Sequence, residues 1–101
     1  MSETPLLDFE TVLTVVSASI RWKILKVVCD GELIGPQDLA PLVGCTPSAA
    51  SKHLRVLLDA GVCVQGRGGL YRLAPQFLPP PGQKVIDFGY CLVRLDAQPA
   101  N

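Results

Sequence analysis

Residues 46–61 read TPSAASKHLRVLLDAG. Thr46 followed by Pro47 is typical of a helix N-cap and first turn, and Gly61 is typical of the position just after a helix end. On a wheel of about 100° per residue, apolar side chains gather on one side and polar side chains lie opposite them. The apolar side holds Ala50, Leu54, Leu57 and Leu58, the opposite side holds Ser48, Lys52, Arg55 and Asp59, and Ser51 and His53 flank the apolar stripe. The stretch predicts an amphipathic helix over 47–60 with a basic outer face.

The residues before this helix predict three more helices. A short one runs from Pro36 to Gly44, and a tight turn near Gly44 and Cys45 joins it to the helix 47–60, which makes a helix-turn-helix. Further upstream, Ser19 is expected to cap a helix that ends at Asp30 and Gly31. A first helix is expected over 5–18, where a run of β-branched residues leaves a strand as the alternative.

The residues after the helix 47–60 predict β structure. In 62–65, two valines alternate with Cys63 and Gln65, as in a strand. A Gly-rich turn spans 66–69 and the chain returns through 70–73, as in a hairpin with a basic tip. Pro75, Pro79, Pro80, Pro81 and Gly82 exclude helix and indicate an extended connector. Residues 85–95 then predict one long strand that is apolar on both faces, covered by its own domain and by a partner's copy. The predicted fold is α+β, mainly α: a winged helix-turn-helix with a two-stranded wing and an extra C-terminal β-strand.

Length and composition indicate one small globular domain. The chain has 101 residues, of which 49% are hydrophobic and 18% are charged, which excludes disorder for most of it. We assign 1–78 to the winged helix-turn-helix domain, whose expected DNA-binding role rests on the charges and the resemblance described below, and 79–101 to a Pro-rich connector and C-terminal strand within the same domain. Because a small domain buries a smaller share of its apolar surface than a large one, we expect a homodimer, with 79–101 in its interface.

The charges are unevenly distributed although the net charge is zero. Residues 1–45 carry six acidic and three basic side chains, whereas 46–72 carry Lys52, Arg55, Arg67 and Arg72 against Asp59 alone. A local basic patch is sufficient for an electrostatic footprint on DNA.

Neither a membrane span nor a basic signal-peptide start is present in the sequence, so a cytoplasmic protein with no membrane partner is expected. The four cysteines are scattered without a Cys-x-x-Cys pair, which favours free, mostly buried thiols. A thiol or metal sensor built from them is the alternative; the residues are Cys45, Cys29, Cys63 and Cys91. Cys45 is the first to test, because the dipole of the following helix favours a thiolate there.

The stretch 17–73 resembles the bacterial ArsR/SmtB family of transcriptional repressors. The Ser-Lys-His-Leu run at 51–54 is a fairly specific signature of the family. The other matching residues are Arg21, Ile24, Leu25, Gly31, Glu32, Leu33, Asp38, Leu39, Ala40, Leu57, Ala60, Gly61, Val62, Tyr71, Arg72 and Leu73. The resemblance implies a homodimer that binds a short inverted repeat and leaves it when an effector binds.

The sequence departs from that family at its usual metal sites. Metal sensors of the family often carry a Cys-x-Cys pair after the Glu-Leu that begins the third helix, but here Ile34 and Gly35 follow Glu32 and Leu33. Other members bind zinc on a long C-terminal helix, and this chain has one histidine and a proline run there. We therefore expect no metal and no cofactor, and a dimer built by the first helix with the C-terminal strand.

The candidate DNA-binding residues are Thr46, Ser48, Ala49, Ser51, Lys52, His53, Arg55, Arg67, Tyr71 and Arg72. Ser48, Ala49, Ser51 and Lys52 would enter the major groove, Arg55 would reach a base edge or phosphate, and Arg67 a phosphate or the minor groove. The alternatives are a solvated helix face and an ordinary flexible hairpin tip. For His53, packing or a phosphate contact is favoured over metal binding, and for Tyr71 packing within the wing.

The sequence thus predicts a homodimeric repressor that binds double-stranded operator DNA with the helix 47–60 and the wing tip 66–69. Its effector is unknown. The first alternative is a winged-helix protein-interaction module that uses the apolar C-terminal strand. The second is a thiol- or metal-responsive repressor with a non-standard cysteine site. An enzyme is not expected, because the single histidine has no paired carboxylate and no nucleophile lies in a recognisable elbow.

Overall fold

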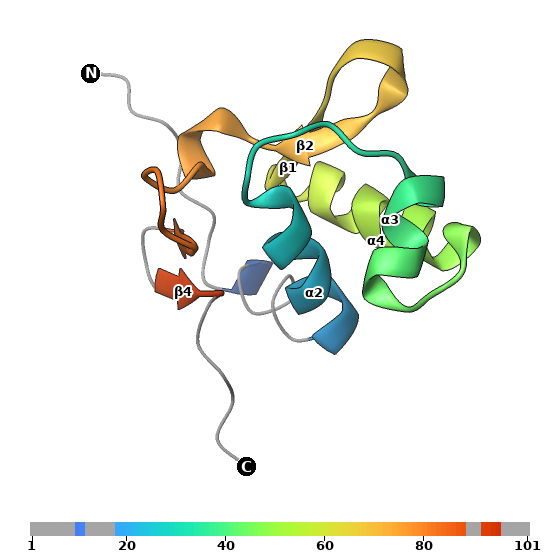
Figure 1. Cartoon of the computed structure of the whole chain (residues 1–101), viewed down its shortest axis with the longest axis horizontal. Coiled ribbons are helices and arrows are strands. Elements are labelled where there is room, and N and C mark those ends of the chain that lie inside the picture. Colours follow the sequence, from blue (N-terminus) through green and yellow to red (C-terminus); the bar gives the residue numbers. More distant parts are fainter. Residues whose placement is uncertain (1–9, 12–17, 89–91, 96–101) are drawn as a thin grey trace.

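The computed structural model describes residues 10–11, 18–88 and 92–95. From α2 to β2 its elements follow the predicted order (Figure 1). The helices are α2 (Ser19–Val28), α3 (Pro36–Val43) and α4 (Pro47–Asp59). Two pairs of strands follow with two 3₁₀ turns; in chain order these are β1 (Cys63–Gln65), η1 (Arg67–Gly69), β2 (Tyr71–Leu73), η2 (Pro75–Phe77), β3 (Val85–Asp87) and β4 (Leu92–Arg94). Three helices followed by a two-stranded antiparallel wing confirm the α+β winged-helix prediction.

The start of α2 differs from the prediction. Ala18, in an extended conformation, precedes the helix, and its carbonyl accepts from the backbone amides of Arg21 and Trp22 at 3.0 and 3.1 Å. Ser19 is already the first helical residue, so its assignment as the N-cap is wrong, and α2 has no side-chain cap. Of the expected first helix 5–18, Glu10 and Thr11 are helical, Ala18 is extended, and the rest lies outside the described residues.

The helix-turn-helix forms where Gly44 and Thr46 predict it. Gly44 ends α3 in the left-handed conformation with φ of 79°, which glycine adopts at little cost. The Thr46 hydroxyl accepts a hydrogen bond from the Ala49 amide at 3.1 Å and so satisfies one of the free donors at the start of α4. The two helices bury facing apolar stripes, Leu39, Ala40 and Val43 from α3 and Ala50, Leu54 and Leu57 from α4. This packing fixes which side of α4 faces outward.

The wing has one more partner than the sequence indicated. Strands β1 and β2 pair antiparallel, with Cys63 opposite Leu73 and Gln65 opposite Tyr71. On the other edge of β2, Ile34 and Tyr71 exchange two backbone hydrogen bonds of 2.8 and 2.9 Å. The loop between α2 and α3 is therefore tied to the wing.

The region predicted as one long strand over 85–95 is a hairpin. Strands β3 and β4 pair antiparallel with Ile86 opposite Val93, so the chain reverses direction between Asp87 and Leu92. Reversal gives the strands backbone partners that one isolated strand would lack. One face is buried through Ile86, Phe88, Val93 and Leu95, while the other face remains open, so the expectation of cover on both faces is not met within one chain.

The connector before this hairpin is also less extended than predicted. Residues Pro75–Phe77 form a single 3₁₀ turn, which proline at its first position allows. Phe77 packs its ring against Phe88 with centroids 5.2 Å apart, which attaches the C-terminal hairpin to the core. None of the helices within the described ranges is long and apolar enough to cross a membrane.

Candidate nucleic-acid interface

The outer face of α4 is a row of polar and basic side chains. Ser48, Ser51, Lys52 and Arg55 are exposed, and Ala49 among them is half-buried. Arg55 forms an ion pair with Asp59 one turn later, at 3.4 Å, with exposed fractions of 70% and 69%. Because an exposed pair of this kind contributes little to stability, Arg55 is available to another anion at low cost. With Ala50, Leu54 and Leu57 buried, the opposite side of α4, which carries Lys52 and Arg55, faces solvent.

The wing supplies two further exposed cations. Arg67 lies in η1 at the tip and Arg72 in the middle of β2, opposite Val64. Gly68 and Gly69 follow Arg67 with φ of 71° and 76°, a region that side chains rarely adopt, and a Cβ on either would meet open space. Figure 1 shows the wing loop projecting from the body. The tip is thus slim enough for its backbone to approach a surface closely.

His53 lies on the side of α4 that faces α2. Its side chain is half-buried, and Arg21 Nη1 donates a hydrogen bond to its Nδ1 at 3.4 Å. Burial, and then the positive charge of Arg21, lower the pKa of His53 below its ordinary value of 6.5. The neutral imidazole is therefore the favoured form and serves as an acceptor between two helices. Sequence patterns gave no signal for this contact, because its partners lie 32 residues apart.

Two members of the predicted set have other contacts in the structure. The Tyr71 side chain is 7% exposed and belongs to the core, which favours the packing role over a DNA contact. The Thr46 hydroxyl caps α4, although the residue itself is exposed beside Ser48. The structure brings together Ser48, Ser51, Lys52 and Arg55 on one helix face, and Arg67 and Arg72 on the neighbouring wing.

A hollow of about 540 Å³ that the sequence did not indicate adjoins the start of α4. Pro36 and Asp38 of α3, Pro47 and Ser48 of α4, and Leu70 of the wing line it. Leu70 is 37% exposed and packs against Gly35, where a Cβ would lie 3.0 Å from its methyl carbon. The wing therefore rests on the N-terminal ends of both helices of the helix-turn-helix.

The cysteines occupy three different environments. Cys63 is buried in β1, and burial raises the pKa of its thiol to about 12. Cys29 is buried at the end of α2, Cys45 is half-buried before α4, and Cys91 lies outside the described residues. All three described thiols are free. Within the described part of the chain, no three His, Cys, Asp or Glu side chains are grouped so that they could hold a metal ion.

Comparison with known proteins gives one finding. Residues 18–62, from the N-cap of α2 to the residue before β1, match the family model of the bacterial regulatory proteins of the arsR family. Neither the curated proteins nor the solved structures gave a match to the chain. The matched segment contains α2, the helix-turn-helix and the whole basic face of α4.

Proposed function

Because residues 18–62 are an arsR-family helix-turn-helix segment, the chain is a DNA-binding regulator of transcription, and we propose that it acts as a homodimeric repressor. Each subunit inserts the helix 47–60 into the major groove of an inverted-repeat operator and lays the wing tip 66–69 on the flanking backbone. The observation that carries the proposal is the exposed row Ser48, Ser51, Lys52 and Arg55, which α2 and α3 leave open to solvent.

The chemistry of this row suits a DNA groove. Serine hydroxyls donate to or accept from base edges, and Lys52 and Arg55 neutralise phosphates or bind guanine. Arg67 and Arg72 extend the same positive field along the wing. The site residues of the proposal are Thr46, Ser48, Ala49, Ser51, Lys52, His53, Arg55, Arg67 and Arg72; Tyr71 supports the wing from inside. The proposal requires no cofactor, no catalysis and no compartment other than the cytoplasm.

The dimer is proposed to use the C-terminal segment 79–101 together with the N-terminal helix. Figure 1 places the β3–β4 hairpin on the side of α2 away from α3 and α4, so a partner there would leave the basic faces free. Leu92 is 64% exposed on the open face of this hairpin, directly opposite Asp87. For two copies of α4 to enter successive major grooves, a two-fold contact at this place must set them about one helical turn of DNA apart, roughly 34–36 Å.

The test is fluorescence anisotropy of the full chain on its own upstream intergenic DNA and on a scrambled duplex of equal length. We expect preference for the upstream DNA, and an affinity that falls by about 0.9 logarithmic units per logarithmic unit of salt for each phosphate neutralised. Measurements with and without reductant show whether thiols act on binding. Equal, weak binding to both duplexes contradicts the proposal.

The exposed leucine on the hairpin supports a second candidate, a protein-interaction module that binds its partner through β3 and β4. The salt dependence of DNA binding, together with the oligomeric state, distinguishes the two candidate functions. Salt-insensitive behaviour together with a monomeric state favours the interaction module. Salt-sensitive, sequence-selective binding by a dimer favours the repressor.

A further inference from the structure

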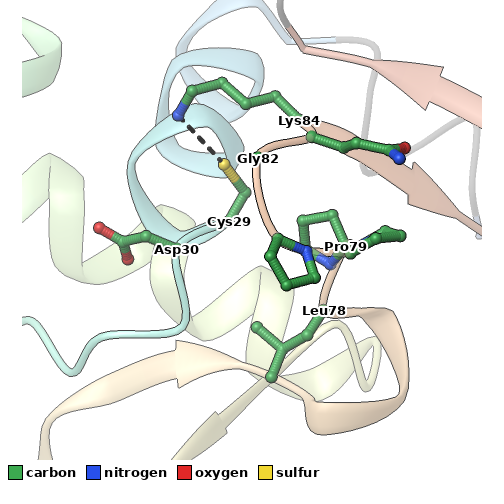
Figure 2. Close-up of a pocket in the computed structure, with 9 residues that line it drawn as sticks. Cys29, Asp30, Leu78, Pro79, Gly82 and Lys84 are labelled. Carbon is green, nitrogen blue, oxygen red and sulfur yellow. Dashed lines mark hydrogen bonds between the residues drawn. The ribbon is translucent and has the colours of Figure 1, made fainter.

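A hollow far from the basic face lies at the end of α2. Cys29 and Asp30 form one wall, and the connector and the approach to β3, residues 78–84, form the other. Its volume is about 470 Å³, and Figure 2 shows the Cys29 sulfur and the Lys84 side chain converging at its edge. Segments that are widely separated in the sequence therefore meet around one thiol.

The Cys29 thiol makes two polar contacts. The Cys29 Sγ–H donates to the Lys26 carbonyl at 3.2 Å, and Lys84 Nζ donates to Sγ at 3.8 Å. Lys84 is an exposed residue whose flexible side chain nevertheless lies along the hollow toward the sulfur. In Figure 2 the Asp30 carboxylate points away from this pair. A nucleophilic sulfur and an amine from positions 55 residues apart are thus held at a distance that lysine side-chain rotation can close.

We propose that Cys29 and Lys84 form a peroxide-responsive covalent switch, in which oxidation joins Cys29 Sγ to Lys84 Nζ through a sulfur–nitrogen bond. Sulfur supplies two electrons to a hydroperoxide: the thiol and hydrogen peroxide give a sulfenic acid and water. The Lys84 ammonium group loses a proton to water, and the resulting amine attacks the sulfenic sulfur. The S–O bond breaks, the S–N bond forms, and the hydroxyl leaves as a second molecule of water with one amine hydrogen.

The reverse reaction restores both residues. Two equivalents of a thiol reductant reduce the S–N bond to the Cys29 thiol and the Lys84 amine, and are themselves oxidised to a disulfide. The S–N bond is therefore reversible, whereas oxidation to a sulfinic or sulfonic acid is irreversible in most proteins.

The neighbouring thiols provide internal contrasts. Cys63 is 1% exposed in β1, where burial keeps the thiol protonated and unreactive. Cys29 is also largely buried, at 4% exposed, but it is one of the residues that line the hollow, and we expect hydrogen peroxide to reach its sulfur by this route. Reaction at Cys29 before Cys63 is the expected order.

The S–N bond would restrict the movement of the C-terminal hairpin relative to α2. It would fasten the end of α2 to Lys84, whose carbonyl accepts from the Leu95 amide at 2.7 Å, and so hold the C-terminal hairpin against the helices. A covalent link between residues 55 apart also restricts the unfolded chain, as a disulfide does. Oxidised protein should therefore unfold at a higher temperature than reduced protein.

The test is mass spectrometry of peptides from the full chain after treatment with hydrogen peroxide, in parallel with thermal unfolding. We expect a linked pair of peptides containing Cys29 and Lys84, lighter than their sum by two hydrogen atoms, that disappears with dithiothreitol. Lys84→Arg keeps the charge and removes the primary amine, so it should abolish the linked pair and leave Cys29 sulfenic acid to be captured by dimedone. Lys26→Arg is the matched control, an exposed lysine beside the same thiol, and should leave the linked pair unchanged.

Three results of the peptide analysis would overturn the proposal: no linked pair in the wild-type chain, a linked pair that persists in Lys84→Arg, or Cys29 recovered in a disulfide with another cysteine. The unfolding data give an independent check that does not depend on recovery of peptides. A rise in unfolding temperature upon oxidation that is equal in wild type and Lys84→Arg would also contradict the S–N bond.

Discussion

At the scale of single residues, Lys52 and Arg55 are the sharpest test of the interface. Both side chains are exposed, and Arg55 has only a surface ion pair with Asp59, so alanine at either position should leave stability within about 0.5 kcal/mol of wild type. Each substitution should weaken operator binding by about 1–3 kcal/mol if the side chain reads a base, or lower the salt slope by about one if it binds a phosphate. Anisotropy titrations at several salt concentrations distinguish the two roles.

The matched control for that experiment is Lys23→Ala on α2, which removes another exposed positive charge outside α4 and the wing. A loss of affinity for Lys23→Ala equal to that for Lys52→Ala would indicate only a general effect of net charge. It would then contradict the assignment of α4 as the recognition helix.

His53 predicts a pH dependence of stability. Burial and Arg21 lower its pKa in the folded protein, so the unfolded chain binds more protons just below pH 6.5. The stabilisation from the neutral imidazole is therefore complete above pH 6.5 and is lost as pH falls through the lowered pKa. His53→Gln retains an acceptor for Arg21 but does not titrate, so urea unfolding from pH 7.5 down to pH 5 should show a smaller loss of stability than in wild type. Parallel curves for the two proteins would contradict this role.

At the scale of elements, the cap of α4 carries a measurable share of stability. Thr46 accepts from the Ala49 amide at 3.1 Å, and this helix contributes three residues to the core. Thr46→Ala should lower the free energy of unfolding by about 1 kcal/mol, and Thr46→Ser, which keeps the hydroxyl, by much less. Urea denaturation measures both. Equal losses in the two variants would show that the methyl group, and not the cap, is responsible.

Elements with local signals could be predicted from the sequence, and those with distant partners could not. Pro36, Gly44, Thr46 and Gly61 mark helix ends through their own backbone preferences, and the period of apolar residues identifies the buried side of α4. The pairing of β3 with β4 depends on a reversal that a continuous apolar run conceals. The only local hint was the glycine at position 89 within that run.

In the candidate interface, too, features with a local sequence signal could be predicted, and contacts between distant residues could not. The exposed residues of α4 followed from its period, because burial of one side leaves the other side open. The contact of Arg21 with His53 depends on how α2 is rotated against α4, and the period of a single helix carries no information about that angle. Cys29 and Lys84 meet for a similar reason, across a connector whose path depends on the packing of Phe77 against Phe88.

At the scale of the whole molecule, the proposed roles divide between its two ends. Helix α4 and the projecting tip of the wing lie on one side of α2, and the β3–β4 hairpin lies on the other (Figure 1). Such a division lets an interface between subunits form without covering any proposed DNA contact. It also makes affinity for an inverted repeat depend on the interface, since a monomer engages only one half-site.

Leu92 tests this dependence, because it is 64% exposed on the open face of the hairpin while Ile86 and Val93 fill the buried face. Leu92→Lys should leave the fold of the chain intact and weaken the dimer by about 1–2 kcal/mol, as loss of an apolar interface contact does. Sedimentation equilibrium should show the change in association, and affinity for the inverted repeat should fall while binding to a single half-site stays the same. Leu42→Lys is the matched control, because Leu42 is 63% exposed on α3, away from the hairpin. An unchanged dimer in Leu92→Lys would place the subunit interface elsewhere, and the open face of the hairpin would then be free to bind a different partner.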